Sequence, residues 1–423
     1  MIPTATFQFP EMATVHQRLY SAPTIDIPDA VTRALSTVSL AERTRPGGTV
    51  AVAVGSRGID RLEEVVGRCI QGLRDHGLRP FLVPAMGSHG GGTSEGQKAI
   101  LSHLGITEDR VGAPVHTNME TLSVGRVKDD GTLFCAKDAV EADHLVVINR
   151  VKPHTKFSAP IESGICKMLT IGLGKVDGAT EFHRCAIRHG FGTIQEGAVA
   201  VVENGNFLLG LALIEDGHGQ LAEVSAMSPE GLIAEESRLL QKASRWMGRI
   251  PVEPLDVLVV DMIGKNISGI GMDSNVTGRH RDVTGDFFTS PHVKRIFVRD
   301  LSPESDGNAN GIGLADVTTR RLVNAMDVEK TYVNSIAAIS PEKAAIPMHF
   351  DSDRQALEVC IRTAGLKDGR QARIVRIRDT KSLEHLIVSR ALASDIENHP
   401  NLDVIGPWKT PGFDRKGNLP RFG

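Results

Sequence analysis

The chain has 423 residues and a formal net charge of −3, so it is long enough for two or three domains and its charge argues against non-specific nucleic-acid binding. Its five cysteines include no CxxC pair, which argues against a disulfide framework or structural zinc site and favours a reducing cytoplasm. It contains no run of about 18 apolar residues, and its first 20 residues lack a continuous apolar core, so we expect neither a membrane span nor a signal peptide.

The first part of the chain alternates short apolar runs with helical patterns. Residues 48–55 are almost wholly apolar and end in glycine, which is typical of a buried parallel strand. The apolar stripe that follows is spaced for a helix. In chain order, the expected elements are strand 48–55, helix 62–73, strand 80–85, a glycine-rich loop, helix 94–104, strand 144–149, helices 161–173 and 193–204, strands 207–214 and 220–226, and helix 229–247.

A segment with two prolines and no periodicity, 249–254, predicts a domain boundary. Beyond it we expect strands 255–262, 292–298 and 372–377 and helices 315–326, 354–365 and 382–394. The alternation predicts an α/β protein with two Rossmann-like domains and a cofactor and substrate cleft between them. We assign residues 1–250 to the first domain and 251–395 to the second, and we expect the tail, 396–423, to pack back on the first.

A histidine lies in the glycine-rich loop that follows the second strand. Glycines beside His89 let backbone and ligand approach closely, and Glu95 follows at a helix start. A histidine with a carboxylate partner is the usual form of a general base. A lone loop histidine more often satisfies turn backbone groups, and Glu95 could merely complement the helix dipole.

His154 has the same setting, because it follows the strand 144–149. Open α/β sheets place their sites at such strand ends. Two such histidines could face one substrate from opposite sides, as a racemase requires. The alternative is that Lys152, His154 and Lys156 form a solvated basic loop, and the residues alone weigh both equally.

Two further residues stand out downstream. Lys167 lies in an otherwise apolar, glycine-bounded segment, where a lysine is costly unless it is paired or functional. It could be a covalent or phosphate-binding lysine, or it could snorkel or pair with Glu162. His183 follows sixteen residues later; imidazole is a common nickel, zinc or copper ligand, but one histidine is a metal site only if a cofactor brings the other ligands.

Simpler motifs are missing from the sequence. It holds no P-loop, HExxH, GxSxG or kinase motif set. Gly172-Leu173-Gly174 and Gly269-Ile270-Gly271 lack the full dinucleotide fingerprint and its context. A dinucleotide site is therefore poorly supported.

Taken together, these residues resemble the nickel-dependent lactate racemase family. The loop from Gly87 through Ser88 and His89 to Glu95 is similar to the family's first histidine loop, and His154 falls where the family has its second catalytic histidine. The remaining matches are a cofactor lysine, a nickel-ligating histidine with the same sixteen-residue separation, and an arginine of the first site loop; in this sequence they are Lys167, His183 and Arg57.

The resemblance implies a nickel-pincer nucleotide, a pyridinium mononucleotide that holds nickel through two sulfurs and a ring carbon. It implies that Lys167 anchors this cofactor, with Ser88 and Glu95 also at the cofactor, and that His183 binds the nickel. It further implies inversion of a 2-hydroxy acid at Cα, with His89 and His154 as the acid/base pair, Arg57 at the site, and a hydride passing to the cofactor and back. A hydride acceptor avoids forming a carbanion beside a carboxylate.

The sequence departs from the family's pattern at Val54, where the family has an aspartate, and in the residues 155–164 and 264–273. These departures leave the identity of the 2-hydroxy acid open. Candidates for binding its carboxylate are Lys152, Lys156, Lys265 and Arg279, although any of them could be ordinary surface charge.

We therefore expect a 2-hydroxyacid racemase or epimerase that depends on nickel-pincer nucleotide and on the enzymes that make it. The expected ligand is a small 2-hydroxy acid, with no nucleic acid or membrane partner; a homo-oligomer remains open. The alternatives are an NAD-dependent oxidoreductase of a hydroxy acid and a non-catalytic protein that binds the cofactor or an organic acid.

Overall fold

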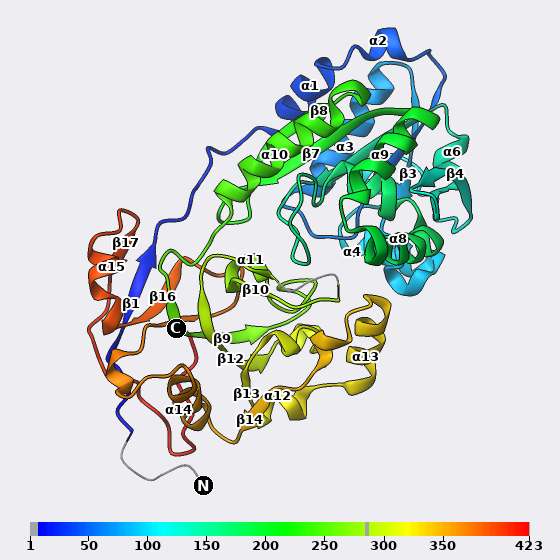
Figure 1. The fold of residues 1–423 in the computed structure, drawn as a ribbon. Helices are drawn as coiled ribbons and strands as arrows, with labels where there is room; N and C mark the ends of the chain where they lie inside the picture. Colours follow the sequence, from blue (N-terminus) through cyan, green and yellow to red (C-terminus); the bar gives the residue numbers. More distant parts are fainter. Residues whose placement is uncertain (1–6, 284–286, 423) are drawn as a thin grey trace. The chain divides into compact units, whose positions relative to one another are not determined.

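The computed structural model describes residues 7–283 and 287–422. The chain divides into two compact units, one formed by Tyr20–Met247 and the other by Met1–Leu19 together with Gly248–Gly423. Each unit is built on a sheet with parallel strands and flanking helices (Figure 1). The predicted α/β class is confirmed.

The unit Tyr20–Met247 contains a five-stranded sheet in the order β3-β2-β6-β7-β8. The first four strands are parallel, and β8 pairs antiparallel with β7. Its strands are β2 (Thr49–Val54), β3 (Arg79–Pro84), β6 (His144–Arg150), β7 (Phe207–Glu215) and β8 (Leu221–Met227). All five strands that the sequence predicts in this part of the chain are present.

Strand β2 shows why the sequence pattern is continuous rather than alternating. Val50, Val52 and Val54 belong to one buried cluster, with α1 and α3. Ala51 and Ala53 belong to another cluster on the opposite face. Both faces of the sheet are therefore covered, which is the usual state of a parallel sheet. The longer helices of this unit are α1 (Ile27–Ser36), α3 (Leu62–Asp75), α4 (Ser94–His103), α8 (Lys175–His189), α9 (Thr193–Asn204) and α10 (Leu232–Trp246).

Smaller elements complete this unit. They are the helices α2 (Leu40–Arg43), α5 (Glu108–Val111) and α6 (Lys137–Glu141), a hairpin of β4 (Thr121–Val127) and β5 (Gly131–Ala136), and the short turns η1 (Gly90–Gly92) and η3 (Pro229–Gly231).

The helix that we expected over 161–173 is different. It starts as the short α7 (Ile165–Lys167) and continues as a π-helical turn, η2 (Met168–Gly172). Residues before it stay in a loop because the Glu162 carboxylate accepts hydrogen bonds from backbone N–H groups of that loop, including His154 N at 2.7 Å. Gly164, with a φ of +86°, turns the chain into the helix.

The order of the sheet locates its binding edge. Numbered along the chain, the five strands run 2-1-3-4-5, and the direction of winding reverses between β2 and β6. In open α/β sheets of this order, ligands bind beyond the carboxyl ends of the strands at that reversal. The loops after β2, β3 and β6 are therefore where this fold favours a site.

The other unit contains an eight-stranded sheet in the order β14-β13-β12-β9-β15-β16-β1-β17. Strands β14, β13, β12, β9 and β15 are parallel, and the remaining pairings are antiparallel. The strands are β1 (Met12–Gln17), β9 (Leu255–Ile263), β12 (Val293–Leu301), β13 (Val317–Thr319), β14 (Met348–Phe350), β15 (Ile374–Ile377), β16 (His385–Ser389) and β17 (Leu402–Val404). A separate two-stranded sheet consists of β10 (Arg279–His280) and β11 (Phe287–Phe288). The helices of this unit are α11 (Ser274–Thr277), α12 (Arg320–Ala325), α13 (Val328–Ala337), α14 (Asp353–Thr363) and α15 (Ala393–Glu397). Its short turns are η4 (Pro303–Ser305), η5 (Ile312–Leu314), η6 (Pro341–Ala344), η7 (Gly369–Gln371) and η8 (Arg390–Leu392).

Both ends of the chain correct the predicted domains. The first nineteen residues do not belong with the unit Tyr20–Met247, because β1 pairs with β16 and β17. The tail 396–423, which we expected on the first domain, belongs to the second unit as well. Antiparallel pairing between segments nearly four hundred residues apart leaves no local signal in the sequence.

Two predicted helices of this unit contain strands: 315–326 begins with β13 and is helical only over α12 (Arg320–Ala325), and 382–394 contains β16. Within 315–326, β13 pairs with β12 and β14, and Thr318 and Thr319 donate their hydroxyls to carbonyls of β12, at 2.8 and 2.7 Å. Within 382–394, β16 pairs with β1 and β15. Both strands are rich in β-branched residues, which favour pleated backbone.

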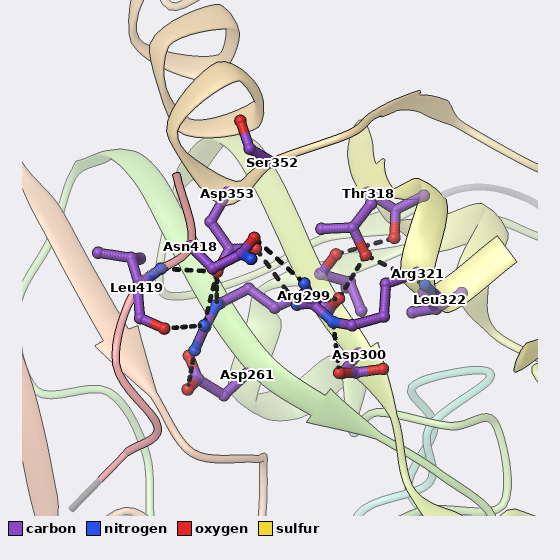
Figure 2. Close-up of polar contacts among 12 residues, drawn as sticks. Asp261, Arg299, Asp300, Thr318, Arg321, Leu322, Ser352, Asp353, Asn418 and Leu419 are labelled. Carbon is purple, nitrogen blue, oxygen red and sulfur yellow. Dashed lines mark hydrogen bonds and ion pairs between the residues drawn. The ribbon is translucent and has the colours of Figure 1, made fainter. Parts of the chain in front are cut away.

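A buried charge network fixes the C-terminal tail to this sheet (Figure 2). Arg299 on β12 lies between the carboxylates of Asp261 on β9 and Asp353 on α14, with 2.6 Å to the latter. The same guanidinium donates to Leu419 O at 2.8 Å, and Leu419 N donates to Asp353 at 3.0 Å. Because each buried charge has an opposite partner, the network holds the tail in one register.

All five cysteines are buried and unpaired with one another. Among the helices of the described residues, none combines the length and the apolar character needed to cross a membrane.

Candidate functional site

Three of the predicted site residues lie beyond the carboxyl ends of neighbouring strands. Arg57 follows β2, His89 follows β3 and His154 follows β6. Strand β2 lies between the other two, and neighbouring strands are about 4.8 Å apart, so β3 and β6 end about 10 Å from each other. The two histidines thus come from opposite sides of the strand that carries Arg57.

The His89 loop depends on its glycines. Gly87, Gly90, Gly91 and Gly92 have φ between +59° and +68°, a region that side chains with a Cβ rarely adopt. A Cβ on Gly90 would lie 2.5 Å from the backbone of Gly96. The loop therefore folds tightly onto the start of α4.

Within this loop, the imidazole of His89 is exposed, and its Nδ1 lies 2.5 Å from the hydroxyl oxygen of Ser56, which follows β2. Ser88 is exposed beside it, and Glu95, the carboxylate expected to partner the histidine, is exposed in the first turn of α4. The helix is capped by Thr93, whose hydroxyl accepts from Gly96 N at 3.1 Å.

His154 and Lys167 are in direct contact. The amine nitrogen of Lys167 lies 2.7 Å from Nε2 of His154, while Nδ1 of the same ring accepts the backbone N–H of Lys156 at 3.1 Å. A neutral imidazole that accepts at Nδ1 carries its proton on Nε2. In that tautomer Nε2 donates to the neutral form of the Lys167 amine.

Electrostatics leads to the same conclusion about Lys167. Burial, followed by repulsion from the cations Arg57, Lys156 and Lys152, lowers the pKa of the Lys167 amine from 10.5 to about 8. An amine with this pKa is partly neutral at physiological pH. It has the properties of a nucleophilic lysine.

The loop between β6 and α7 is ordered by a buried carboxylate and by stacked rings. Glu162 accepts from Ala159 N at 2.9 Å as well as from His154 N. The rings of Phe157 and Phe191 are stacked at 4.2 Å with 4° between their planes, and His154 lies 4.4 Å from Phe157. These contacts fix the orientation of the imidazole.

The charges around this edge are mostly positive. Lys156 is 8% exposed, with its ammonium 5.5 Å from the Phe191 ring, and Lys152 and Arg57 act on Lys167. The Glu162 carboxylate is already occupied by backbone N–H groups. The site therefore favours an anionic ligand such as a carboxylate or phosphate.

His183 lies half-buried on α8 beside Phe182. Among the described residues, the donor group with metal-ligand spacing is Asp130, Cys185 and His189, which does not include it. Asp130 also pairs with Arg188 and Arg184, and these cations oppose a metal ion there. A metal on His183 would need ligands that the described side chains do not supply.

The two candidates in the other unit have partners of their own. Lys265 donates to Gly269 O at 2.6 Å and to Asn334 at 2.7 Å. Arg279 is 8% exposed and pairs with Asp316 at 2.5 Å. We assign Arg279 a structural role, because its guanidinium also donates to two backbone carbonyls.

Sequence reasoning did not identify three residues that contact the site. Ser56 contacts His89, Phe191 stacks on Phe157, and Glu236 on α10 accepts from Ile165 N at 2.8 Å at the start of the helix that bears Lys167. Burial raises the pKa of the Glu236 carboxyl to about 8. A glutamate on the apolar face of a helical pattern is the one signal that was present in the sequence.

Comparison with known structures finds a similar fold. The chain is similar to the lactate racemase apoprotein from Thermoanaerobacterium thermosaccharolyticum, with a TM-score of 0.55 and 14% sequence identity over 88% of this chain and 99% of that one. No protein-family model matches the sequence, and no curated protein sequence matches it either. At this identity the likeness is one of fold.

Proposed function

We propose that this protein is a 2-hydroxyacid racemase or epimerase that inverts Cα with His89 and His154 as its acid/base pair. The observation that carries the proposal is the contact between His154 Nε2 and the Lys167 amine at 2.7 Å, with His89 on the far side of β2. The resemblance to lactate racemases in sequence and in fold supports the same chemistry.

The residues fit a nickel-pincer nucleotide. The neutral amine of Lys167 suits a covalent anchor, the positive charge of Lys152 and Lys156 suits a phosphate, and His183 would be the protein's ligand to nickel. Among the residues described, His183 belongs to no group of three or more metal-donor side chains, so the cofactor would have to bring further ligands. When bound, this group supplies a hydride acceptor and donor for Cα.

The chain's own residues manage the proton and the orientation. In His154, Nε2 is the ring atom that would exchange a proton with the substrate hydroxyl. To take that proton the ring must carry its own hydrogen on Nδ1, which breaks the contact with the Lys156 N–H. In His89, Ser56 holds Nδ1, and the acid/base role falls to the opposite nitrogen. To Arg57, which follows the strand between them, we assign the binding of the substrate carboxylate.

The test combines mass, metal and stereochemistry. Protein produced together with the cofactor-making enzymes should gain mass on the peptide that contains Lys167 and should carry nickel. The Lys167→Ala variant should do neither, whereas Lys98→Ala, which changes an exposed lysine on α4, should do both. Active protein free of nickel and nucleotide would refute the proposal.

A screen of 2-hydroxy acids for inversion at Cα then identifies the substrate. Substrates labelled with deuterium at Cα should keep the label in the product, because a hydride does not exchange with solvent as an acidic proton does. Activity that instead requires added NAD would favour an oxidoreductase. Tight ligand binding that is indifferent to His89→Ala and His154→Ala would favour a non-catalytic binder.

A further inference from the structure

A second lysine of the same unit has no role in the proposed chemistry but lies under the His89 loop. Lys175, at the start of α8, is 1% exposed. Its ammonium donates to Pro84 O at 2.8 Å and to the side-chain oxygen of Gln97 at 3.1 Å. Both acceptors are neutral, so the buried charge is stabilised by dipoles rather than by a contacting carboxylate.

The backbone at this lysine is also unusual. Lys175 has a φ of +52°, in the left-handed region that disfavours residues with a Cβ. Burial lowers the pKa of its amine to about 8. A buried cation on strained backbone persists only where the surroundings over-determine it, and such positions cluster at functional sites.

The contacts of Lys175 lead directly to His89. Gln97, which is fully buried, accepts from Lys175 and donates from its amide nitrogen to Gly87 O at 2.8 Å and to His89 O at 3.4 Å. Lys175 itself donates to Pro84 O, at the end of β3. The Lys175 amine and the Gln97 amide therefore donate hydrogen bonds to three backbone carbonyls of the segment that carries His89, those of Pro84, Gly87 and His89.

Along the chain, Lys175 lies between Lys167 and His183, two further residues of the proposed site. It follows the π-helical turn after Lys167 and begins the helix that bears His183. The loop packs on this junction, because Gly87 N donates to Gly172 O at 2.9 Å, and a Cβ on Gly92 would lie 2.6 Å from Val176.

We infer that Lys175, through Gln97, is a positioning residue that locks the His89 loop to the chain segment carrying Lys167 and His183. This role rests on the proposed function only for its effect on catalysis; the lock itself is a property of the fold. An apolar side chain of similar length, such as methionine, would fill the space but would leave Pro84 O and the Gln97 side-chain oxygen without this donor. Displacement of a catalytic group by about 1 Å costs roughly a hundredfold in rate.

The test compares Lys175→Met, which keeps length and loses the donor, with Lys98→Met at an exposed position of α4. We expect Lys175→Met to speed hydrogen exchange at least tenfold in both 85–92 and 172–183 and to shift the His89 ring resonance, assigned by its loss in His89→Ala. The Lys98→Met variant should change neither. In enzyme loaded with cofactor, kcat should fall roughly a hundredfold while KM stays within about threefold.

A second variant keeps the inference testable if Lys175→Met does not fold. Gln97→Leu leaves the lysine in place and should loosen only 85–92 and shift the His89 resonance. Unchanged exchange and an unchanged resonance in the folded variants would overturn the inference whatever the activity. Changed exchange and resonance in a protein with no racemase activity would instead refute the proposed function and leave the positioning role intact.

Discussion

The low pKa of the Lys167 amine gives a prediction that needs neither cofactor nor substrate. With a pKa of about 8 instead of 10.5, roughly a quarter of the amine is neutral at pH 7.5, against about 0.1% for an ordinary lysine. This is a roughly 200-fold excess of free amine. A less basic amine is also a weaker nucleophile, and with the sensitivity known for thiols the net gain in reactivity is about tenfold.

The assay is trace acetylation across a series of pH values, followed by mass spectrometry of the peptides. Protein made without the cofactor-making enzymes is used, and the exposed Lys98 peptide is the internal reference. Acetylation of Lys167 should reach half its maximum near pH 8. A midpoint above about 9.5 would refute the argument, because it would mean that the amine is charged and cannot accept from His154.

A pair of arginine variants tests the cause of the shift. Arg57 is the cation with the largest repulsive effect on Lys167, so Arg57→Gln should raise the acetylation midpoint by about half a unit to one unit. Arg61 lies in the same loop but pairs with Asp60 at 3.7 Å. The Arg61→Gln variant should leave the midpoint unchanged, and equal effects of both variants would contradict the assignment.

The remaining predictions concern the histidines and two buried carboxyls. His89→Ala and His154→Ala should each slow inversion by about 10²-fold or more, and single-turnover formation of the 2-keto acid should depend on a different histidine for each enantiomer. Asp353→Asn should lower the free energy of unfolding by about 3–5 kcal/mol in urea titrations, whereas Asp351→Asn, at an exposed pair with Arg320, should change it by less than about 0.5 kcal/mol. The folded pKa of Glu236 lies above its ordinary value, so the folded state binds the extra proton between about pH 4.5 and 8 and stability falls as pH rises through that window; Glu236→Gln should flatten the fall in pH-dependent thermal unfolding.

The strands that position the site could be predicted from sequence because their signal is local. β2, β3 and β6 are buried on both faces, so each appears as an apolar run whose end marks the sheet edge. Arg57, His89 and His154 follow those ends. The sequence did not predict the sheet order β3-β2-β6. This order places the two histidines on opposite sides of the strand that precedes the arginine.

The wrong predictions for the chain ends and for the helix 382–394 share a physical cause, which is pairing between distant parts of the chain. β1 and β17 are short and amphipathic, and their partner strands lie nearly four hundred residues away. The apolar pattern of β16 is compatible with a helix as well as with a strand. Its pairing with β1 and β15 makes it a strand. Tertiary context, not propensity, determines such segments.

The same limit applies within the site. The contact of Ser56 with His89 and that of His154 with Lys167 join loops that only the fold brings together. The sequence marks Lys167 as a lysine in apolar surroundings. It does not show that the Lys167 amine lies 2.7 Å from Nε2 of His154.

The charge state of Lys167 distinguishes two roles in this site, anchoring a cofactor and binding a carboxylate. A lysine that anchors a cofactor must be neutral to react, and once bonded as an amide-like nitrogen it carries no positive charge. Lys167 therefore cannot also hold the substrate carboxylate. The cations that lower its pKa, Arg57, Lys156 and Lys152, remain charged after the anchor forms, and they are the groups left to bind an anion. In the proposed enzyme, the residues that activate the anchor would thus be the same residues that select a carboxylate-bearing substrate.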